Sequence, residues 1–323
     1  MRRCLALLLV LSVAGCTSTA GGTPRATPTA VDPPASGANP SDQGNLHTTS
    51  PGASPRPKPA TPKISSWVYQ LQNYPGGTLE DVAKAPGQLA VIDLARDAKT
   101  DYFRAEEVAA LKRSGKTVLA YFEIGSIENF RPEYPGVKDL VLNRWDDWPE
   151  EFFVRYWEAA WWDKVVRPRL DQAARAGFDG VYLDTPLAYE EIDLKLVKGE
   201  TRETLGRKMA DLIVRIAKYS QQLLIFPQNS PELRKYSGYT EAIDGIGMEE
   251  LFFLATDKPC DEDFCPENLA ETRELRKAGK LVLAVDYATR PENIRKACAS
   301  YAAEGFAGYV TTRALDTLTR SCE

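Results

Sequence analysis

Two carboxylates that end apolar runs are the side chains best suited to do chemistry. Asp184 ends the run at residues 180–184, and Glu249 follows the run at residues 243–248. A buried parallel strand has this pattern, and its last side chain points into a ligand crevice. One carboxyl can protonate a leaving oxygen while the other attacks or activates water, which is how glycosidic bonds are hydrolysed. The pattern therefore indicates a glycosidase pair. The alternative is that both side chains only form hydrogen bonds at the mouth, the opening that the strand ends surround, and take no part in chemistry.

Two other carboxylates compete for a role in this pair. Glu250 directly follows Glu249, and only one of the two can point into the mouth because side chains alternate along a strand. Glu123, which follows the run at residues 118–122, is another candidate for the acid. The sequence leaves both alternatives open.

Polar residues also end the other apolar runs, and together they have the composition of a carbohydrate site. Carboxylates and amides hydrogen-bond hydroxyl or amino groups, and flat rings stack on sugar faces. A tryptophan-rich insertion at residues 127–163 flanks these ends, although we expect any single tryptophan in it to pack rather than to bind sugar. Asp93 and Asp286 are expected to bind substrate or to position the pair. The remaining residues at these ends are Gln70, Gln228, Asn229, Tyr287 and Arg313.

The scarcity of histidine excludes several other chemistries. The only histidine of the chain, His47, precedes the folded part. Nucleophiles activated by histidine and zinc sites with histidine ligands are thereby excluded. No Cys-x-x-Cys motif offers another metal site, so we expect neither a metal nor a cofactor.

Eight apolar runs alternate with helical segments in residues 64–323, and this order predicts an α/β fold. Alternation of strand and helix indicates a parallel sheet, and eight units indicate closure into a (β/α)8 TIM-like barrel. An open doubly wound sheet is the alternative, but no glycine-rich phosphate loop follows any strand. The predicted strands are residues 67–71, 89–93, 118–122, 180–184, 223–226, 243–248, 281–285 and 308–310, with predicted helices at 165–176, 202–219 and 269–278.

Residues 1–15 have the features of a lipoprotein signal peptide. Arg2 and Arg3 precede an apolar run at residues 5–13 that is too short to span a bilayer. Small residues then end in Cys16, which resembles the lipobox of bacterial lipoproteins, where the cysteine carries the lipid. We therefore expect export and a lipid anchor at Cys16 as the sole membrane contact, with an ordinary secretory signal as the alternative.

The composition changes sharply after the signal peptide and again near residue 64. Residues 16–63 hold ten of the chain's 22 prolines and almost no large apolar side chain, which predicts a disordered tether. Six basic and two acidic residues precede residue 64. The domain at residues 64–323 therefore carries 34 basic and 43 acidic residues, a net charge of −9. This balance argues against a nucleic-acid partner and suits a cationic or neutral one.

Four cysteines remain beyond the signal and the expected lipid site. In an oxidising compartment they suggest two disulfides. We favour Cys260 with Cys265 within one loop, and Cys298 with Cys322 joining the last large helix to the C-terminus. Three pairings are possible, and the sequence does not decide among them.

Taken in order, these motifs resemble those of glycoside hydrolase family 114, the endo-α-1,4-polygalactosaminidases and their bacterial lipoprotein relatives. The resemblance covers essentially the whole domain. It implies a (β/α)8-like barrel, a catalytic Asp184, a catalytic Glu249 and endo-acting cleavage of α-1,4-linked galactosamine polymers. The matching stretches are residues 67–71, 91–93, 120–122, 125–126, 128–131, 177–184, 227–229, 245–249 and 285–287.

The resemblance also suggests roles within the site. The family looks retaining, which makes Asp184 the nucleophile and Glu249 the acid/base, although the two roles could be exchanged. Glu123 departs from the family pattern, where serine is common, and an extra carboxylate beside the pair can raise a neighbour's pKa or change which sugar fits. We expect a monomeric enzyme acting on a cationic amino-sugar polysaccharide, with a glycan-binding protein or a glycosidase for another glycan as alternatives. Its further expected substrate-binding residues are Tyr69, Tyr121, Glu128 and Arg131.

Overall fold

The computed structural model describes residues 60–319 and 322, and its centre is a ring of eight parallel strands. Five form one sheet in the order β1-β2-β3-β7-β8, and three form a second in the order β13-β12-β9. The strands are β1 (Trp67–Gln70), β2 (Leu89–Asp93), β3 (Thr117–Glu123), β7 (Gly180–Asp184), β8 (Leu224–Pro227), β9 (Gly245–Glu249), β12 (Leu281–Tyr287) and β13 (Ala307–Thr311).

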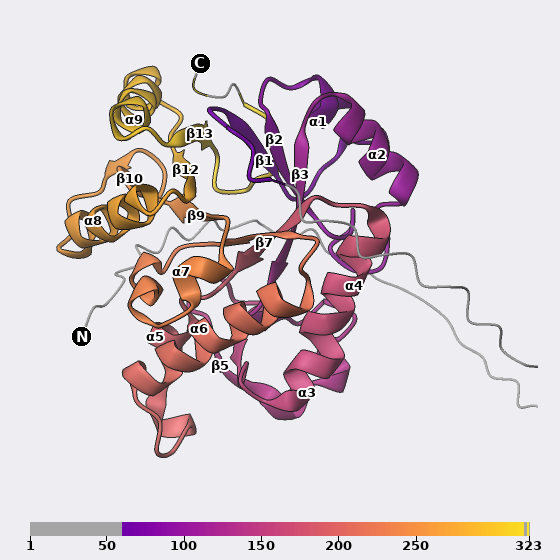
Figure 1. Cartoon of the computed structure of the whole chain (residues 1–323), viewed down its shortest axis with the longest axis vertical. Helices are drawn as coiled ribbons and strands as arrows, with labels where there is room; N and C mark the ends of the chain where they lie inside the picture. Colours follow the sequence, from indigo (N-terminus) through magenta and orange to yellow (C-terminus); the bar gives the residue numbers. More distant parts are fainter. Residues whose placement is uncertain (1–59, 320–321, 323) are drawn as a thin grey trace, which may run out of the picture. The chain divides into compact units, whose positions relative to one another are not determined.

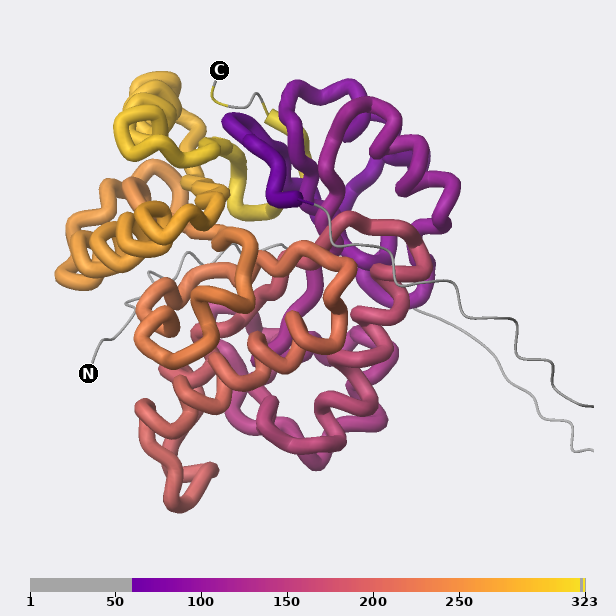
Figure 2. Tube along the Cα trace, in the orientation of Figure 1, coloured from indigo at the N-terminus to yellow at the C-terminus, as the bar shows by residue number. Residues whose placement is uncertain are grey.

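Two isolated parallel bridges close the ring. Ser66 pairs with Gly308, which joins the first strand to the last, and Gln228 pairs with Gly247, which joins the two sheets. Figure 2 follows the chain from the indigo start of the ring to the yellow strand beside it. The predicted TIM-like barrel is thus confirmed, and each of its strands overlaps the predicted one.

Large aromatic side chains fill the inside of the barrel. The ring centres of Tyr69 and Tyr182 are 5.3 Å apart, and Trp67 lies 5.6 Å from Tyr69. The indole N–H of Trp67 donates to the carbonyl of Ala307 at 3.0 Å. Gly247 has no side chain because a Cβ there would lie 2.0 Å from the hydroxyl of Tyr182. The lower part of the barrel is therefore a packed core, so substrate can enter only above it.

Helices connect the strands and lie outside them, as Figure 1 shows for α1 and α2 beside β1, β2 and β3. Helix α8 begins five residues earlier than predicted, because its Pro266 lies in the first turn, where no amide hydrogen is needed. The helices are α1 (Glu80–Lys84), α2 (Ala105–Arg113), α3 (Ala159–Trp161), α4 (Arg167–Ala176), α5 (Ala188–Glu191), α6 (Arg202–Tyr219), α7 (Tyr239–Ala242), α8 (Phe264–Lys277) and α9 (Pro291–Glu304). Among the described residues, no helix is both long and apolar enough to cross a bilayer.

The tryptophan-rich insertion after β3 contains a small antiparallel sheet that the sequence did not predict. It consists of β4 (Ser126–Glu128), β6 (Glu151–Val154) and β5 (Val141–Arg144), in that order. Trp161 and Trp162 are buried as expected, whereas Trp148, in the turn between β5 and β6, is 42% exposed. The insertion therefore brings strands of its own to the top of the barrel.

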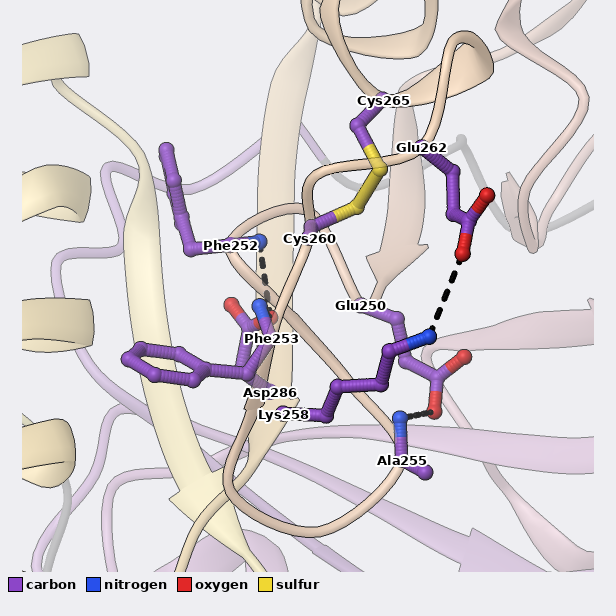
Figure 3. Close-up of a disulfide and its surroundings, with 9 residues drawn as sticks. All are labelled: Glu250, Phe252, Phe253, Ala255, Lys258, Cys260, Glu262, Cys265 and Asp286. Atoms are coloured by element: carbon purple, nitrogen blue, oxygen red, sulfur yellow. Dashed lines mark hydrogen bonds and ion pairs between the residues drawn. A yellow bond between two sulfur atoms is a disulfide. The ribbon is translucent and has the colours of Figure 1, made fainter. Parts of the chain in front are cut away.

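Both favoured disulfides are present. Cys260–Cys265 joins the end of the loop that follows β9 to the first turn of α8, and Figure 3 shows this bond with Glu250 and Asp286 in its surroundings. The loop also contains a short hairpin of β10 (Phe253–Leu254) and β11 (Lys258–Pro259). Cys298–Cys322 joins α9 to the C-terminal segment. The expected signal peptide, the lipid site at Cys16 and most of the expected tether lie outside the described residues.

Candidate active site

Asp184 ends β7, and hydrogen bonds fix both oxygens of its carboxyl group. The hydroxyl of Tyr121, on the neighbouring β3, donates to Oδ2 at 2.5 Å. The backbone N–H of Thr185 donates to Oδ1 at 2.6 Å. Both donors stabilise the ionised form. The carboxyl group is thus held in one orientation at the end of its strand.

The chain turns sharply just after this carboxylate. Thr185 has a φ of +61°, a conformation that a β-branched residue rarely adopts. Its buried hydroxyl accepts the amide hydrogen of Gly125 at 3.0 Å and lies 2.9 Å from the hydroxyl of Ser126. A Cβ at Gly125 would lie 2.2 Å from the carbonyl oxygen of Thr185, so glycine alone fits there. The β3–β4 connection therefore holds this turn in place.

Glu249 ends β9 and has a matching set of partners. The hydroxyl of Tyr287, at the end of β12, donates to its Oε1, and the side-chain amide of Asn229 donates to its Oε2 at 3.3 Å. The Asn229 side chain also accepts the backbone N–H of Glu249 at 2.9 Å. The residue after it, Glu250, has a φ of +57°, so this carboxylate is also followed by a left-handed turn.

Asp184 and Glu249 lie close enough to influence each other's ionisation. Burial and then the charge of Glu249 raise the pKa of Asp184 to about 7. Tyr182 and Tyr69, which lie below the mouth, have raised pKa values because they are buried and because both carboxylates face them. The hydroxyl of Tyr69 donates to the side-chain oxygen of Gln228 at 3.4 Å. The pair therefore shares one site with a floor of tyrosines.

Glu250 points to a different set of partners from Glu249. It accepts the backbone N–H of Ala255 at 2.6 Å, in the loop between β9 and the Cys260–Cys265 disulfide (Figure 3). Burial and then the charge of Glu249 raise its pKa to about 7. Its position supports the loop, whereas Glu249 has the tyrosine and asparagine partners inside the mouth.

Glu123 and Asp93 end β3 and β2, and both belong to a buried ion cluster. Arg131 donates to Glu123 at 2.5 Å and to Asp93 at 3.1 Å, and Arg169 of α4 donates to Glu123 at 2.6 Å. Glu123 is 0% exposed. Although burial acts against its charge, the two guanidinium groups hold the pKa of Glu123 well below its usual range. This geometry favours support of the strand ends over contact with sugar or proton donation.

Some of the other expected binding residues surround Asp184 and Glu249, and the others bind neighbouring loops or the ion cluster. Gln70 and Asp286 are buried and tie down neighbouring loops: Gln70 donates to the carbonyls of Gln72 and Asn73, and Asp286 accepts from Phe252 and Phe253. Glu128 binds Arg131 at 2.7 Å at the edge of the ion cluster. The residues gathered around Asp184 and Glu249 are Tyr69, Tyr121, Gln228, Asn229 and Tyr287.

Glu151 is a further carboxylate of this site that the sequence did not indicate. It lies on β6, opposite Glu128 on β4, and contacts the hydroxyl of Ser126. Burial and then the charge of Asp184 raise its pKa well above the usual range. Glu151 is the first residue of its strand and does not end an apolar run, so the sequence pattern that identified Asp184 could not identify it.

A contact across the mouth joins the insertion to the last barrel strand. The guanidinium of Arg313, just after β13, lies 5.2 Å from the ring centre of Trp148, and its Nη2 lies 3.7 Å from Asp147. The insertion follows β3, which is separated from β13 by β1 and β2 in the ring. The positive charge of Arg313 also reaches Glu250. Trp148 therefore lies at the edge of the mouth on the side of Glu249.

Comparisons with known proteins agree with this geometry. The sequence model of glycoside-hydrolase family GH114 matches residues 48–323. An uncharacterized protein of Deinococcus radiodurans is 33% identical over 296 residues, which cover 89% of this chain and 92% of the relative. A second relative, from Thermotoga maritima, is 29% identical over 242 residues, which cover 69% of this chain and 71% of that protein.

Two solved structures share the fold. Aspergillus fumigatus Ega3, in complex with galactosamine, has a TM-score of 0.64 at 19% identity, covering 81% of this chain and 96% of Ega3. The glycoside hydrolase domain of PelA from Pseudomonas aeruginosa has a TM-score of 0.61 at 20% identity, covering 79% of this chain and 97% of that domain. The chain therefore belongs to glycoside-hydrolase family GH114 and is a glycosidase.

Proposed function

We propose that the protein is an endo-acting, retaining glycosidase that cleaves an extracellular polymer of α-1,4-linked galactosamine. The observation that carries the proposal is the pairing of Asp184 and Glu249, each at the end of its own strand and each held by its own tyrosine. One intervening strand separates β7 from β9, so their backbones are about 10 Å apart. Carboxyl groups that point inward from such positions can come within about 5 Å of each other, the separation that is typical of retaining enzymes.

In the proposed reaction Asp184 is the nucleophile and Glu249 is the acid/base. Glu249 gives its proton to the glycosidic oxygen while the Asp184 carboxylate forms a bond to the anomeric carbon. Glu249 then takes a proton from water, and that water displaces Asp184 and restores both groups. The charge of Glu249 is one cause of the raised pKa of Asp184, so the ionisation of the two groups is linked, as expected for a pair that exchanges acid and nucleophile forms during the reaction.

The charge of the site supports a cationic sugar as substrate. Carboxyl groups end two of the barrel strands at the mouth, Asp184 on β7 and Glu249 on β9, and the domain as a whole is acidic. An ammonium group on the sugar would be attracted to this negative potential. The complex of Ega3 with galactosamine gives a precedent for such a ligand on this fold.

Trp148 is well placed to bind the polymer beyond the cleaved bond. Its ring is partly exposed at the edge of the mouth, and Arg313 fixes its position. A flat exposed ring can stack on the face of a pyranose. We assign it to a sugar subsite on the Glu249 side.

The proposed location is the outer face of the cell membrane, where a monomeric domain is tethered through lipid on Cys16. The basis is the sequence of residues 1–16 and the proline-rich composition of residues 16–63. A Cys16→Ser variant should lose incorporation of a labelled fatty acid and should appear in the medium. Unchanged labelling of that variant would refute the anchor.

The substrate is tested by incubating the protein with three polymers: partly deacetylated α-1,4-galactosamine, its fully acetylated form, and a β-1,4-linked glucosamine polymer. We expect a mixture of short oligomers from the first polymer, and NMR of fresh products should show the α-anomer before mutarotation. Release of monomers alone would contradict endo cleavage, and the β-anomer would contradict retention. Binding without any cleavage would favour a glycan-binding protein.

A further inference from the structure

Glu151 connects the insertion to the turn that carries Asp184. It is 7% exposed, and its carboxyl group contacts the hydroxyl of Ser126 at the start of β4. Oγ of Ser126 lies 2.9 Å from Oγ1 of Thr185, which in turn lies 2.8 Å from the carbonyl oxygen of Asp184. Three consecutive contacts thus run from Glu151 to the backbone of Asp184.

Counting protons along this chain of contacts determines the state of Glu151. Each hydroxyl has one hydrogen to donate, and an ionised carboxylate has none. Ser126 and Thr185 together can therefore supply two of the three contacts. The amide hydrogen of Gly125 adds none, because Thr185 Oγ1 accepts it as a separate bond. All three contacts are hydrogen bonds only if Glu151 donates to Ser126, Ser126 to Thr185, and Thr185 to the carbonyl of Asp184.

We propose that Glu151 is a positioning residue that carries a proton in the working enzyme and, through Ser126 and Thr185, holds the Asp184 turn in its reactive geometry. This inference rests on the proposed function of Asp184. The turn needs such support because Thr185 adopts a positive φ. Its backbone N–H also donates directly to the Asp184 carboxyl group, so movement of Thr185 moves the nucleophile.

Loss of the proton from Glu151 has two consequences for Asp184. Only two hydrogens then remain for the three contacts: Ser126 turns to the carboxylate, and Thr185 has one hydrogen to share between Ser126 and the Asp184 carbonyl, which weakens the hold on the turn. A new negative charge also appears beside Asp184, which favours protonation of the nucleophile. Both effects lower the rate, so Glu151 sets an upper pH limit for catalysis.

The charged groups around Glu151 favour its neutral form. Glu128 faces it from β4, Glu123 from β3 and Asp184 from β7, and all three are carboxyl groups. Arg131 is the neighbouring cation, but its guanidinium is engaged by Asp93, Glu123 and Glu128. Burial together with the charges of Asp184 and Glu123 raises the pKa of Glu151, against smaller opposing effects of Ser126 and Arg131.

Three variants separate the role of the proton from the role of the side chain. Glu151→Gln keeps a donor to Ser126 but cannot ionise, whereas Glu151→Ala and Ser126→Ala interrupt the chain of contacts. We expect kcat of the two alanine variants to fall about tenfold or more, the usual effect of a buried polar partner left unpaired. Glu151→Gln should recover most of that loss, and the alkaline decline of its kcat should lie at higher pH than in the parent, where only the acid Glu249 still limits the rate.

An infrared difference spectrum gives a readout that does not need turnover. The parent minus Glu151→Gln at pH 7 should contain the carbonyl band of a protonated carboxyl group, which disappears at alkaline pH. A carboxylate band at pH 7 would overturn the proposal, as would a Glu151→Gln variant as impaired as Glu151→Ala. If the parent cleaves no polymer, the proposed function fails, while the infrared band still decides whether Glu151 carries the proton.

Discussion

Replacing Asp184 with asparagine should make the protein more stable at neutral pH while it removes activity. The pKa of Asp184 is raised from 3.8 to about 7 by burial and by the charge of Glu249. The folded state therefore binds the proton more tightly than the unfolded state does. The stability that this group contributes is fully present below about pH 4 and is lost as pH rises through about 7. Asparagine has a similar shape and no charge, so Asp184→Asn avoids that loss.

The expected gain follows from the size of the pKa shift. A change from 3.8 to about 7 corresponds to about 4 kcal/mol above pH 7, because one pH unit is worth about 1.4 kcal/mol. Asp184 is partly exposed at the mouth, and water there reduces the cost of its charge. We therefore expect Asp184→Asn to raise the free energy of unfolding by about 2 to 4 kcal/mol at pH 8 and by almost nothing at pH 4.

Urea unfolding at pH 4, 6 and 8 measures this difference directly. Asp257→Asn is the matched control with the opposite sign. Burial opposes the charge of Asp257, but Thr289, Asn293 and backbone amides lower its pKa to about 2. That variant should be less stable than the parent at pH 8, and the deficit should shrink toward pH 2. An Asp184→Asn variant that gains no stability between pH 4 and pH 8 would refute the electrostatic description of the site.

Three other predictions concern the supports of the site. Trp148→Ala should raise KM for long polymers about tenfold with little change in kcat, since only a stacking contact is lost; an equal effect on a disaccharide substrate would contradict this subsite. Glu123→Gln should lower the free energy of unfolding by about 3 to 5 kcal/mol, because Arg131 and Arg169 lose a buried partner; a loss below 1 kcal/mol in urea would show that the cluster contributes little. Cys298→Ser should lower the free energy of unfolding by about 3 kcal/mol in thermal unfolding, because the disulfide closes a separation of 24 residues; a variant as stable as the parent under oxidising conditions would contradict a stabilising role for this bond.

The barrel and the catalytic pair could be predicted because both depend on local pattern. A buried strand appears as an apolar run, and Asp184 and Glu249 each end one. The neighbours of a strand end cannot be read in the same way. Glu123 and Asp93 end runs as well, yet Arg169, which neutralises Glu123, lies on a helix 46 residues away. Charge pairing across elements decides which carboxylates reach the mouth, and a single sequence does not contain that pairing.

The strands of the insertion could not be predicted from the sequence for a different reason. Its aromatic residues pack on the barrel, so their spacing follows the shape of the surface beneath them rather than a helix or strand period. Glu151 enters the site from β6, and Trp148 reaches Arg313 across the mouth. Both positions depend on how the small sheet docks, which only the three-dimensional structure reveals.

The most direct test of the catalytic pair is the initial rate of oligomer release from partly deacetylated α-1,4-galactosamine polymer. Asp184→Asn, Glu249→Gln and the double variant are compared with the parent, with Asp257→Asn as control. Because the two carboxylates act in one reaction, we expect each single variant to lose about a thousandfold or more and the double variant to lose little beyond that. Substantial activity in either single variant would contradict the assignment, and for Glu249→Gln it would transfer the acid role to Glu250.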